Sequence, residues 1–466
     1  MSPTQGMKDS HLALPAGVAS CPATPRRGTG FALYRAGYTA LPQALLLAGA
    51  AFLATAPRAA ALPFLPAQDS LVLEQVPGAR DPSDQALRRA NAALAQERGN
   101  VGLAATVARL DIEQARRLGD PRFLGRAEAA LAPWPLAPGA PIEVLLLRAV
   151  ILQSNHDFAG SIAALQRVVE LQPATAQAWL TLAAVHQAQA EYRAALHDCG
   201  QFASHTLGLA PDTCTASVMS LTGHAPLALR AVTLSLAQNA EEARASPATA
   251  VWALTMAAET AERLGNPSVE QRYREALAAD GADPYLLGAW SDWLLDQGRA
   301  QEVVALLRDR TRIDPLLLRL ALAEQAVGAS HLSGHVADLA ARFEASRLRG
   351  DTVHRREEAR FALWLLHQPV RALDLARANW AVQREPADAR ILLEAANEAG
   401  QPAASDPVRA WMHDNNVEDD LLSAVAVGGR GAPVPGDHAA LVPAVATMLA
   451  ARSASVPGSS ARRGGQ

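Results

Sequence analysis

The stretch 142–173 reads IEVLLLRAVILQSNHDFAGSIAALQRVVELQP, and it aligns without a gap on 176–207, AQAWLTLAAVHQAQAEYRAALHDCGQFASHTL. Equivalent residues are 34 positions apart, as Phe158 and Tyr192 illustrate. An upstream segment keeps the same register, because Leu124 precedes Phe158 by another 34 residues. Self-similarity at a fixed period of this size is typical of repeat architectures. The stretch therefore predicts an array of repeated units.

Each unit contains the pattern of two helices. Apolar residues recur at three- and four-residue steps, which indicates amphipathic helices. The small residues Ala115, Ala149 and Ala183 share one position in successive first helices, where two antiparallel helices must approach closely. A large residue opens each second helix and fits the space beside the alanine. Pro173 ends a unit, because proline cannot continue a helix.

This pattern resembles the tetratricopeptide repeat. The residues on that family's signature positions are Pro173, Trp179, Leu182, Ala183, Tyr192 and Ala195. The resemblance implies an all-α fold, with helix-turn-helix repeats stacked into a right-handed α–α superhelix. The whole arrangement is also similar to a group of exported bacterial tetratricopeptide proteins.

The repeat continues more loosely downstream. Segments 251–281, 285–315 and 355–386 follow the signature, two of them with a short deletion, whereas 205–250 keeps helical periodicity alone. We expect about eight or nine helix pairs within 81–427. A solenoid needs its signature residues for stacking, so we interpret these positions as core and look for function on the concave surface.

The N-terminus predicts export. The apolar run 41–56, LPQALLLAGAAFLATA, is too short for a typical transmembrane helix, and Arg35 precedes it. Small residues ending at Ala61 match a cleavage site, so residues 1–61 are interpreted as a signal peptide with a long basic region. The mature chain would begin at Leu62 in the periplasm or outside the cell. The alternative is an uncleaved anchor in the inner membrane.

Lipidation at Cys21 and a twin-arginine signal at Arg26-Arg27 are less favoured alternatives for this region. Residues 62–80 are apolar and bounded by proline, which suggests a strap against the first helices. The tail 428–466 is rich in Gly, Pro, Ser and Ala, a composition typical of disorder.

Composition excludes several function classes. Of 466 residues 50% are hydrophobic, which supplies a sizeable core, and the formal charge of −4 gives no basic footprint for nucleic acid. No phosphate-binding loop, serine-nucleophile elbow or CxxC pair occurs. His331 and His335 lie one helical turn apart, but no acidic residue stands between them. We therefore predict a protein that is not an enzyme and has no cofactor and no metal.

The concave face offers a modestly acidic stripe. If 285–296 forms a first helix, one of its faces joins acidic residues of the preceding unit. The groove candidates are Glu259, Glu262, Tyr285, Asp292 and Asp296. Such a stripe suits a basic or polar segment, and a solvated helix face explains it equally well.

Two cysteines are disulfide candidates. Cys199 lies late in a second helix, and Cys214 lies fifteen residues on, across a turn, at the start of the next helix. Neighbouring antiparallel helices can bring the two Cα atoms within bonding range, and export would supply an oxidising compartment. The alternative is a pair of buried free thiols.

These features predict a non-enzymatic exported scaffold that binds a protein or an extended peptide in its concave groove. The alternative is an accessory subunit of an envelope assembly or secretion machine, in contact with a membrane only if the N-terminal segment is uncleaved. A remoter alternative is an enzyme or metal-binding protein with an unrecognised groove site.

Overall fold

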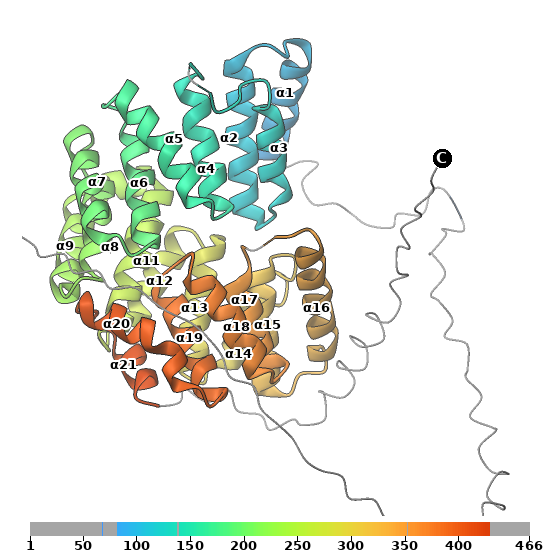
Figure 1. The fold of residues 1–466 in the computed structure, drawn as a ribbon, viewed down its shortest axis with the longest axis vertical. Helices are drawn as coiled ribbons and strands as arrows, with labels where there is room; N and C mark the ends of the chain where they lie inside the picture. Colours follow the sequence, from blue (N-terminus) through green and yellow to red (C-terminus); the bar gives the residue numbers. More distant parts are fainter. Residues whose placement is uncertain (1–67, 69–81, 138, 352, 429–466) are drawn as a thin grey trace, which may run out of the picture. The chain divides into compact units, whose positions relative to one another are not determined.

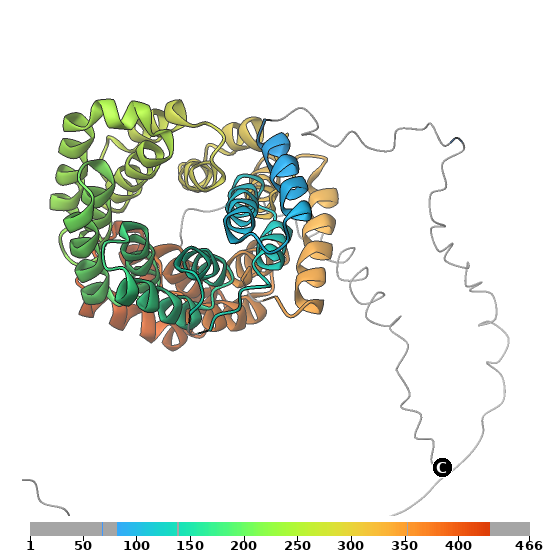
Figure 2. The same cartoon turned by 90° about the horizontal axis from the view of Figure 1, so that it is seen from above.

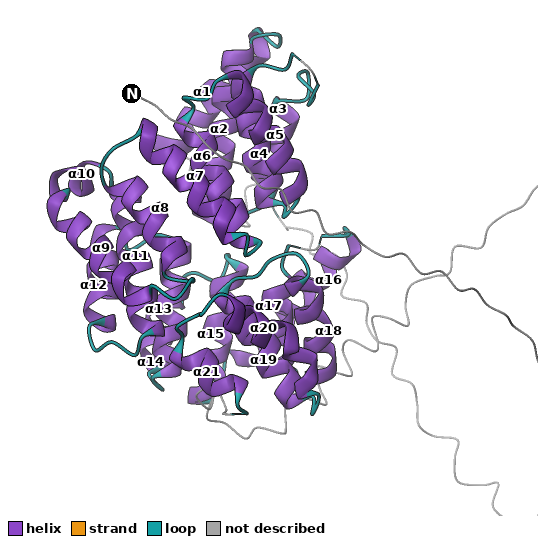
Figure 3. Ribbon diagram, turned by 60° about the vertical axis from the view of Figure 1, so that its left-hand side comes forward, coloured by secondary structure: helices purple, strands orange, loops and turns teal. Residues whose placement is uncertain are grey.

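The computed structural model describes residues 68, 82–137, 139–351 and 353–428. The chain divides into the units Met1–Gln75 and Val76–Gln466, and the second unit contains every helix described below. Figure 3 shows helices joined by loops throughout, and no strand occurs among these described residues. The all-α class predicted from the sequence is confirmed.

The helices follow one another with short connections. Their bounds are α1 Pro82–Gln96, α2 Val101–Leu118, α3 Arg122–Ala130, α4 Ile142–Ser154, α5 Phe158–Leu171, α6 Ala176–Ala188, α7 Tyr192–His205, α8 Leu209–Met219, α9 Ala225–Gln238, α10 Ala240–Ala245, α11 Pro247–Arg263, α12 Val269–Ala279, α13 Pro284–Asp296, α14 Ala300–Leu307, α15 Asp314–Val327, α16 Leu332–Leu348, α17 Arg355–Arg360, the π-helix η1 Phe361–Leu365, α18 Pro369–Trp380, α19 Pro386–Glu398, the 3-10 helix η2 Pro402–Ser405, α20 Asp406–Asp414 and α21 Asp420–Ala426.

Contacts between the helices define a solenoid of helix pairs. The pairs are α2/α3, α4/α5, α6/α7, α8/α9, α11/α12, α13/α14, α15/α16, α17/α18 and α19/α20. The first helix of each pair also contacts the first helix of the next pair, through η1 in the case of α15 and α17. This ladder of first helices winds about a common axis (Figure 2), so the repeat solenoid predicted from the 34-residue period is confirmed.

Local sequence signals explain where helices begin and end. Asp157 and Asp283 each accept a hydrogen bond from a backbone N–H of the following turn, at 2.9 Å, which satisfies a donor that the helix leaves unpaired. Gly119 and Gly328 end α2 and α15 in the left-handed conformation, with φ of 60° and 68°, which glycine adopts without steric cost.

The repeat residues are core residues, as their spacing predicts. Ala149 and Ala183 are buried, and so are Phe158 and Tyr192, the large residues that open the second helices. Burying a large aromatic side chain contributes on the order of 2 kcal/mol, so these positions hold neighbouring helices together.

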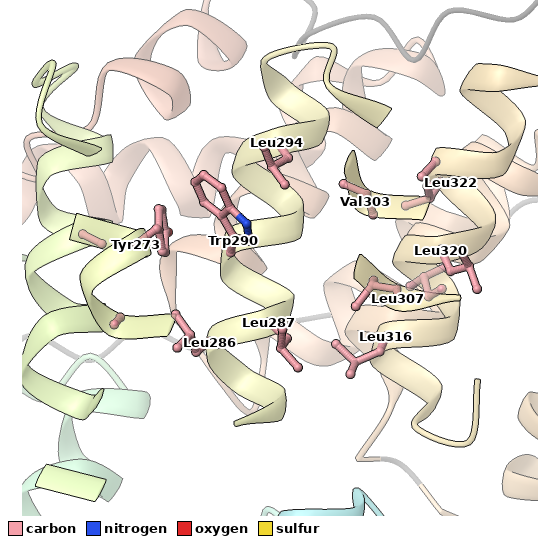
Figure 4. Packing of buried hydrophobic residues seen from close by; sticks show 14 of the residues in the cluster. Tyr273, Leu286, Leu287, Trp290, Leu294, Val303, Leu307, Leu316, Leu320 and Leu322 are labelled. Atoms are coloured by element: carbon pink, nitrogen blue, oxygen red, sulfur yellow. The ribbon is translucent and has the colours of Figure 1, made fainter. Parts of the chain in front are cut away.

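The largest hydrophobic cluster of the described residues extends from α8 to η1, and Figure 4 shows part of it. Tyr273 packs against Trp290 with ring centroids 5.3 Å apart, and Trp290 stacks on Trp293 at 4.9 Å. The guanidinium of Arg299 covers the Trp293 ring at 5.4 Å. Leucines of α13 and α15 belong to the same cluster, which packs α13 against its neighbours.

The superhelix closes on itself within the unit Val76–Gln466. Helix α13 contacts α2, and the backbone N–H of Arg384 donates to the carbonyl oxygen of Ala188 at 2.7 Å. Trp411 reaches Tyr192, and the backbone N–H of Ala225 donates to Glu418 at 2.7 Å. Helices α20 and α21 therefore lie beside the middle of the array (Figure 1).

Three sequence predictions lie outside the described residues: the apolar run 41–56, the strap 62–80 and almost all of the tail 428–466. Among the helices that the structure does describe, none combines the length and the apolar character needed to cross a bilayer.

Candidate functional site in the interior cavity

A cavity of about 960 Å³ lies inside the superhelix. Its walls come from the inward faces of α2, α4, α6, α8, α11, α13 and α15, which are all first helices of pairs. Leu124 of α3, Phe158 of α5 and residues near the starts of α17 and α19 also line it. The winding of the solenoid therefore turns its concave surface into an interior space, and the volume is within the range of small-molecule and peptide sites.

One wall of the cavity is apolar. Leu180 and Ala184 of α6 and Leu221 after α8 face the interior space. Across the α8–α11 contact, Trp252 and Met256 of α11 continue this surface. The wall offers contact area for aliphatic or aromatic groups.

Helix α11 contributes both apolar and charged side chains to the cavity wall. Trp252, Met256, Glu259 and Arg263 follow one another at steps of four, three and four residues, and all four line the cavity. This spacing places side chains on one face of a helix. One helix face thus presents an indole, a thioether, a carboxylate and a guanidinium to the same space.

Tyr285 projects into the cavity from the start of α13. It keeps 63% of its surface exposed, and its hydroxyl donates to Glu259 Oε1 at 2.7 Å. Burial raises the pKa of Glu259, although the hydrogen bond from Tyr285 opposes the rise. The charge of Glu259 raises the pKa of Tyr285 well above its ordinary value. The two groups form a coupled pair on the cavity surface.

Glu262 lies on the same helix but does not line the cavity. Its Oε2 accepts a hydrogen bond from the buried Tyr273 hydroxyl at 2.8 Å. Burial raises the pKa of Glu262 to about 8, and the neighbouring Asp296 and Glu259 add to the rise. The structure thus assigns Glu262 to the packing between α11 and α12.

Asp292 lines the cavity between two arginines. Arg319 of α15 approaches its carboxylate at 2.5 Å and Arg360 of α17 at 2.8 Å. Burial raises the pKa of Asp292, but the two guanidinium groups outweigh it and hold the pKa well below the usual range. Asp292 is therefore an ionised partner within the fold.

Asp296 is paired in the same way. Arg390 of α19 donates to both of its oxygens at 2.6 Å, and the same guanidinium reaches Glu394 at 2.7 Å. Two members of the acidic stripe expected from the sequence, Asp292 and Asp296, are therefore compensated by arginines of the same chain. These arginines come from helices that follow in the sequence and were not foreseen.

A second ionic cluster also lines the cavity, close enough to Glu259 and Tyr285 for its charges to influence their pKa values. Arg356 contacts Glu357 and Glu385 at 3.2 Å and Asp388 at 3.4 Å. His156 lies near this cluster, and burial, followed by the charge of Arg356, lowers its pKa. Sequence reasoning missed this cluster, because its members come from three separate stretches of chain.

Cys199 of α7 and Cys214 of α8 lie side by side in neighbouring helices. Their Cα atoms are 5.7 Å apart and the structure joins their sulfur atoms. Both residues are buried, and Cys214 touches the cavity wall. The oxidation state in the cell stays a prediction, tested below.

The two histidines noted in the sequence, His331 and His335, make different contacts. His335 Nδ1 lies 2.8 Å from the buried Glu324, whereas His331 stands at the N-cap position of α16, where its side chain makes no capping hydrogen bond. Within the part of the chain that the structure describes, no three His, Cys, Asp or Glu residues gather as a metal site would require.

Comparison with known proteins does not assign this chain to a family. No family model matches this chain, and no curated protein matches its sequence. One solved structure, titled "Crystal Structure of P58(IPK) TPR Domain at 2.5 A", aligns with 68% of this chain and 94% of that chain, at 11% identity and a TM-score of 0.19. That degree of likeness carries no argument, so the solenoid assignment rests on the helix pairing itself.

Proposed function

We propose that this chain is an exported, non-enzymatic scaffold that binds a protein or an extended peptide in the concave interior of its solenoid. The observation that supports this proposal is the cavity, because the first helices of successive pairs line it. Rigid helical repeats present long concave surfaces of this kind, which suit polypeptide ligands. Apolar and polar groups on the cavity wall offer contacts for both side chains and backbone.

The proposed domain organisation is a signal peptide, residues 1–61, a strap, 62–80, the solenoid, 81–427, and a disordered tail, 428–466. The apolar run 41–56 and the alanines that end at Ala61 support export. N-terminal sequencing of the protein from an envelope fraction tests it: we expect a start near Leu62. A membrane-bound product that retains 41–56 would contradict cleavage.

The binding site is tested by filling the cavity. Ala184 is exposed on the cavity wall, so Ala184→Trp adds a large side chain there without displacing core residues. The matched control is Ala163→Trp, at an exposed position of the outer helix α5. In crosslinked affinity capture from a periplasmic extract, we expect Ala184→Trp to lose the captured protein and Ala163→Trp to retain it. Equal capture by both variants would exclude the interior as the site.

An exposed stripe on α9 favours a second candidate function, that of an accessory subunit of an envelope assembly or secretion machine. Leu227 and Leu234 are 54% and 59% exposed and lie two turns apart on one face. Exposed apolar stripes often mark protein interfaces. If this candidate is correct, Leu227→Ser with Leu234→Ser will release the captured partners and Ala184→Trp will not.

A further inference from the structure

Arg263 differs from the other arginines of the cavity. Arg319 and Arg356 lie within ion-pair distance of carboxylates, at 2.5 and 3.2 Å. Arg263 instead donates from Nη2 to the hydroxyls of Ser220, at 2.7 Å, and Thr260, at 3.2 Å. No carboxylate oxygen of the described residues lies within 4.0 Å of its guanidinium. Its buried Nε has no hydrogen-bond partner in that part of the chain.

Glu259 is the complementary case. Its carboxylate accepts the Tyr285 hydroxyl, and no cationic group of the described chain lies within 4.0 Å of it. Burial raises its pKa, and the hydrogen bond from Tyr285 and the charges of Arg263 and Arg356 offset that rise only in part, so its ionised form is incompletely stabilised. A cation placed beside it would supply that stabilisation.

The two unpaired groups are neighbours that do not pair with each other. Positions four apart on a helix place their Cβ atoms roughly 5–6 Å apart, which would permit an ion pair. Glu259 is drawn toward Tyr285 on α13 instead, and Arg263 toward Ser220 after α8. Glu259 and Arg263 therefore present an acidic and a basic group to the same cavity, together with the apolar Trp252 and Met256.

We infer that this cavity binds a small zwitterion with an apolar side chain, a free amino acid or a short peptide. Its ammonium group lies beside Glu259 and the Tyr285 ring, its carboxylate beside Arg263 and Ser220, and its side chain against Trp252 and Met256. Paired charges and a cation over an aromatic face both favour this orientation. An internal segment of a long polypeptide lacks both charges and does not satisfy this pair.

The inference goes beyond the proposed function, because it assigns to one part of the same cavity a small zwitterion that an internal segment of a protein ligand would not replace. Calorimetry of the mature chain tests it with L-leucine, L-phenylalanine and the dipeptides Leu-Leu and Phe-Phe. We expect saturable millimolar or tighter binding of the free amino acids, of the dipeptides, or of both, which separates the two sources. N-acetyl-phenylalanine lacks the ammonium and phenylalanine amide lacks the carboxylate, so each binds about tenfold more weakly or worse than phenylalanine.

Two variants locate the site. Glu259→Gln keeps an acceptor for Tyr285 and removes the negative charge, and Arg263→Met removes the guanidinium. Each weakens binding of the best zwitterion about tenfold or more. The matched controls Glu113→Gln and Arg116→Met alter a pair that also lines the cavity but is bonded to itself at 3.0 Å, and they leave binding within about twofold.

Three results would overturn the inference: no saturable binding of any of the four zwitterions, equal binding of the blocked derivatives, or equal loss in the test and control variants. Circular dichroism of Glu259→Gln and Arg263→Met shows whether each retains its fold, and Glu259→Gln serves alone if Arg263→Met unfolds. Failure of this inference leaves capture of a protein by the unaltered chain intact. Failure of the proposed function shows instead as capture that Ala184→Trp does not change.

Discussion

Trp411 donates its indole Nε1–H to the phenol oxygen of Tyr192 at 3.0 Å, across 219 residues of chain. Both side chains are buried, and Tyr192 is also the residue that opens the second helix of its repeat. One signature residue of the repeat therefore also holds the C-terminal helices against the middle of the array.

Removal of this hydrogen bond should destabilise the whole fold. Tyr192→Phe keeps the ring but leaves a buried indole N–H without an acceptor, which costs about 1–3 kcal/mol. We expect the urea midpoint to fall by the corresponding amount. A double-mutant cycle with Trp411→Phe provides the control, because the paired substitution removes both polar partners. An additive cycle would show that the two residues do not interact in solution.

Replacing Gly119 by alanine tests how tightly the turns of the superhelix pack, with Gly328 as the control. A Cβ on Gly119 would lie 2.8 Å from Ile313 Cγ2, whereas a Cβ on Gly328 meets nothing within 4 Å. Both residues have positive φ, so alanine is strained at either site by about 1–2 kcal/mol. We expect Gly119→Ala to lose roughly 1–3 kcal/mol more than Gly328→Ala, through overpacking. Equal losses in thermal unfolding would show that the turns move apart at little cost.

The ion pairs of Asp292 make it a stability residue. Asp292→Asn leaves the half-buried Arg319 and Arg360 without their shared carboxylate, and we expect a loss of about 3 kcal/mol or more in urea unfolding. Asp309→Asn is the control, because Asp309 is 91% exposed beside Arg308 and its pair contributes little. A loss no larger than that of the control would mean that solvent replaces the carboxylate.

Glu262 predicts a pH dependence of stability. Its pKa is about 8 in the folded chain against an ordinary 4.5, so the folded state retains a proton that the unfolded state has lost. Stability from this group is present at low pH and declines as the pH rises toward 8. Glu262→Gln should therefore gain more than about 1 kcal/mol relative to the unaltered chain between about pH 5 and pH 8. Parallel curves of unfolding free energy against pH would refute this.

The cysteine pair predicts a redox dependence. Thiol titration of the unfolded mature protein should detect no reactive thiol without reductant and two after reduction. Reduction should lower the free energy of unfolding by about 3 kcal/mol, because the bond closes a loop of fifteen residues. Two reactive thiols without reductant would establish the alternative of free buried cysteines.

The sequence predicted the helix pairing because each repeat carries its own signature of small and large residues. Closure of the superhelix could not be predicted, since it depends on twist accumulated over many units and on residues as distant as Tyr192 and Trp411. Tyr285 and Asp292, which the register within 285–296 puts on one face, both line the cavity.

The charge state of that face was not predictable from the same helix. The arginines that neutralise Asp292 and Asp296 belong to α15, α17 and α19. A search for basic residues at inward positions of the later first helices would have indicated Arg319 and Arg390. Their exact partners depend on the winding of the array.

The contact between Tyr192 and Trp411 also determines when folding can be completed during synthesis. A linear repeat array can fold each unit as it leaves the ribosome, because each unit contacts only its neighbours. Here the surface around Tyr192 can be covered only after 219 further residues have been synthesised, which takes about 10–40 s at ordinary rates. Through that interval the middle repeats carry an uncovered apolar surface, and a chaperone that shields it is most useful there.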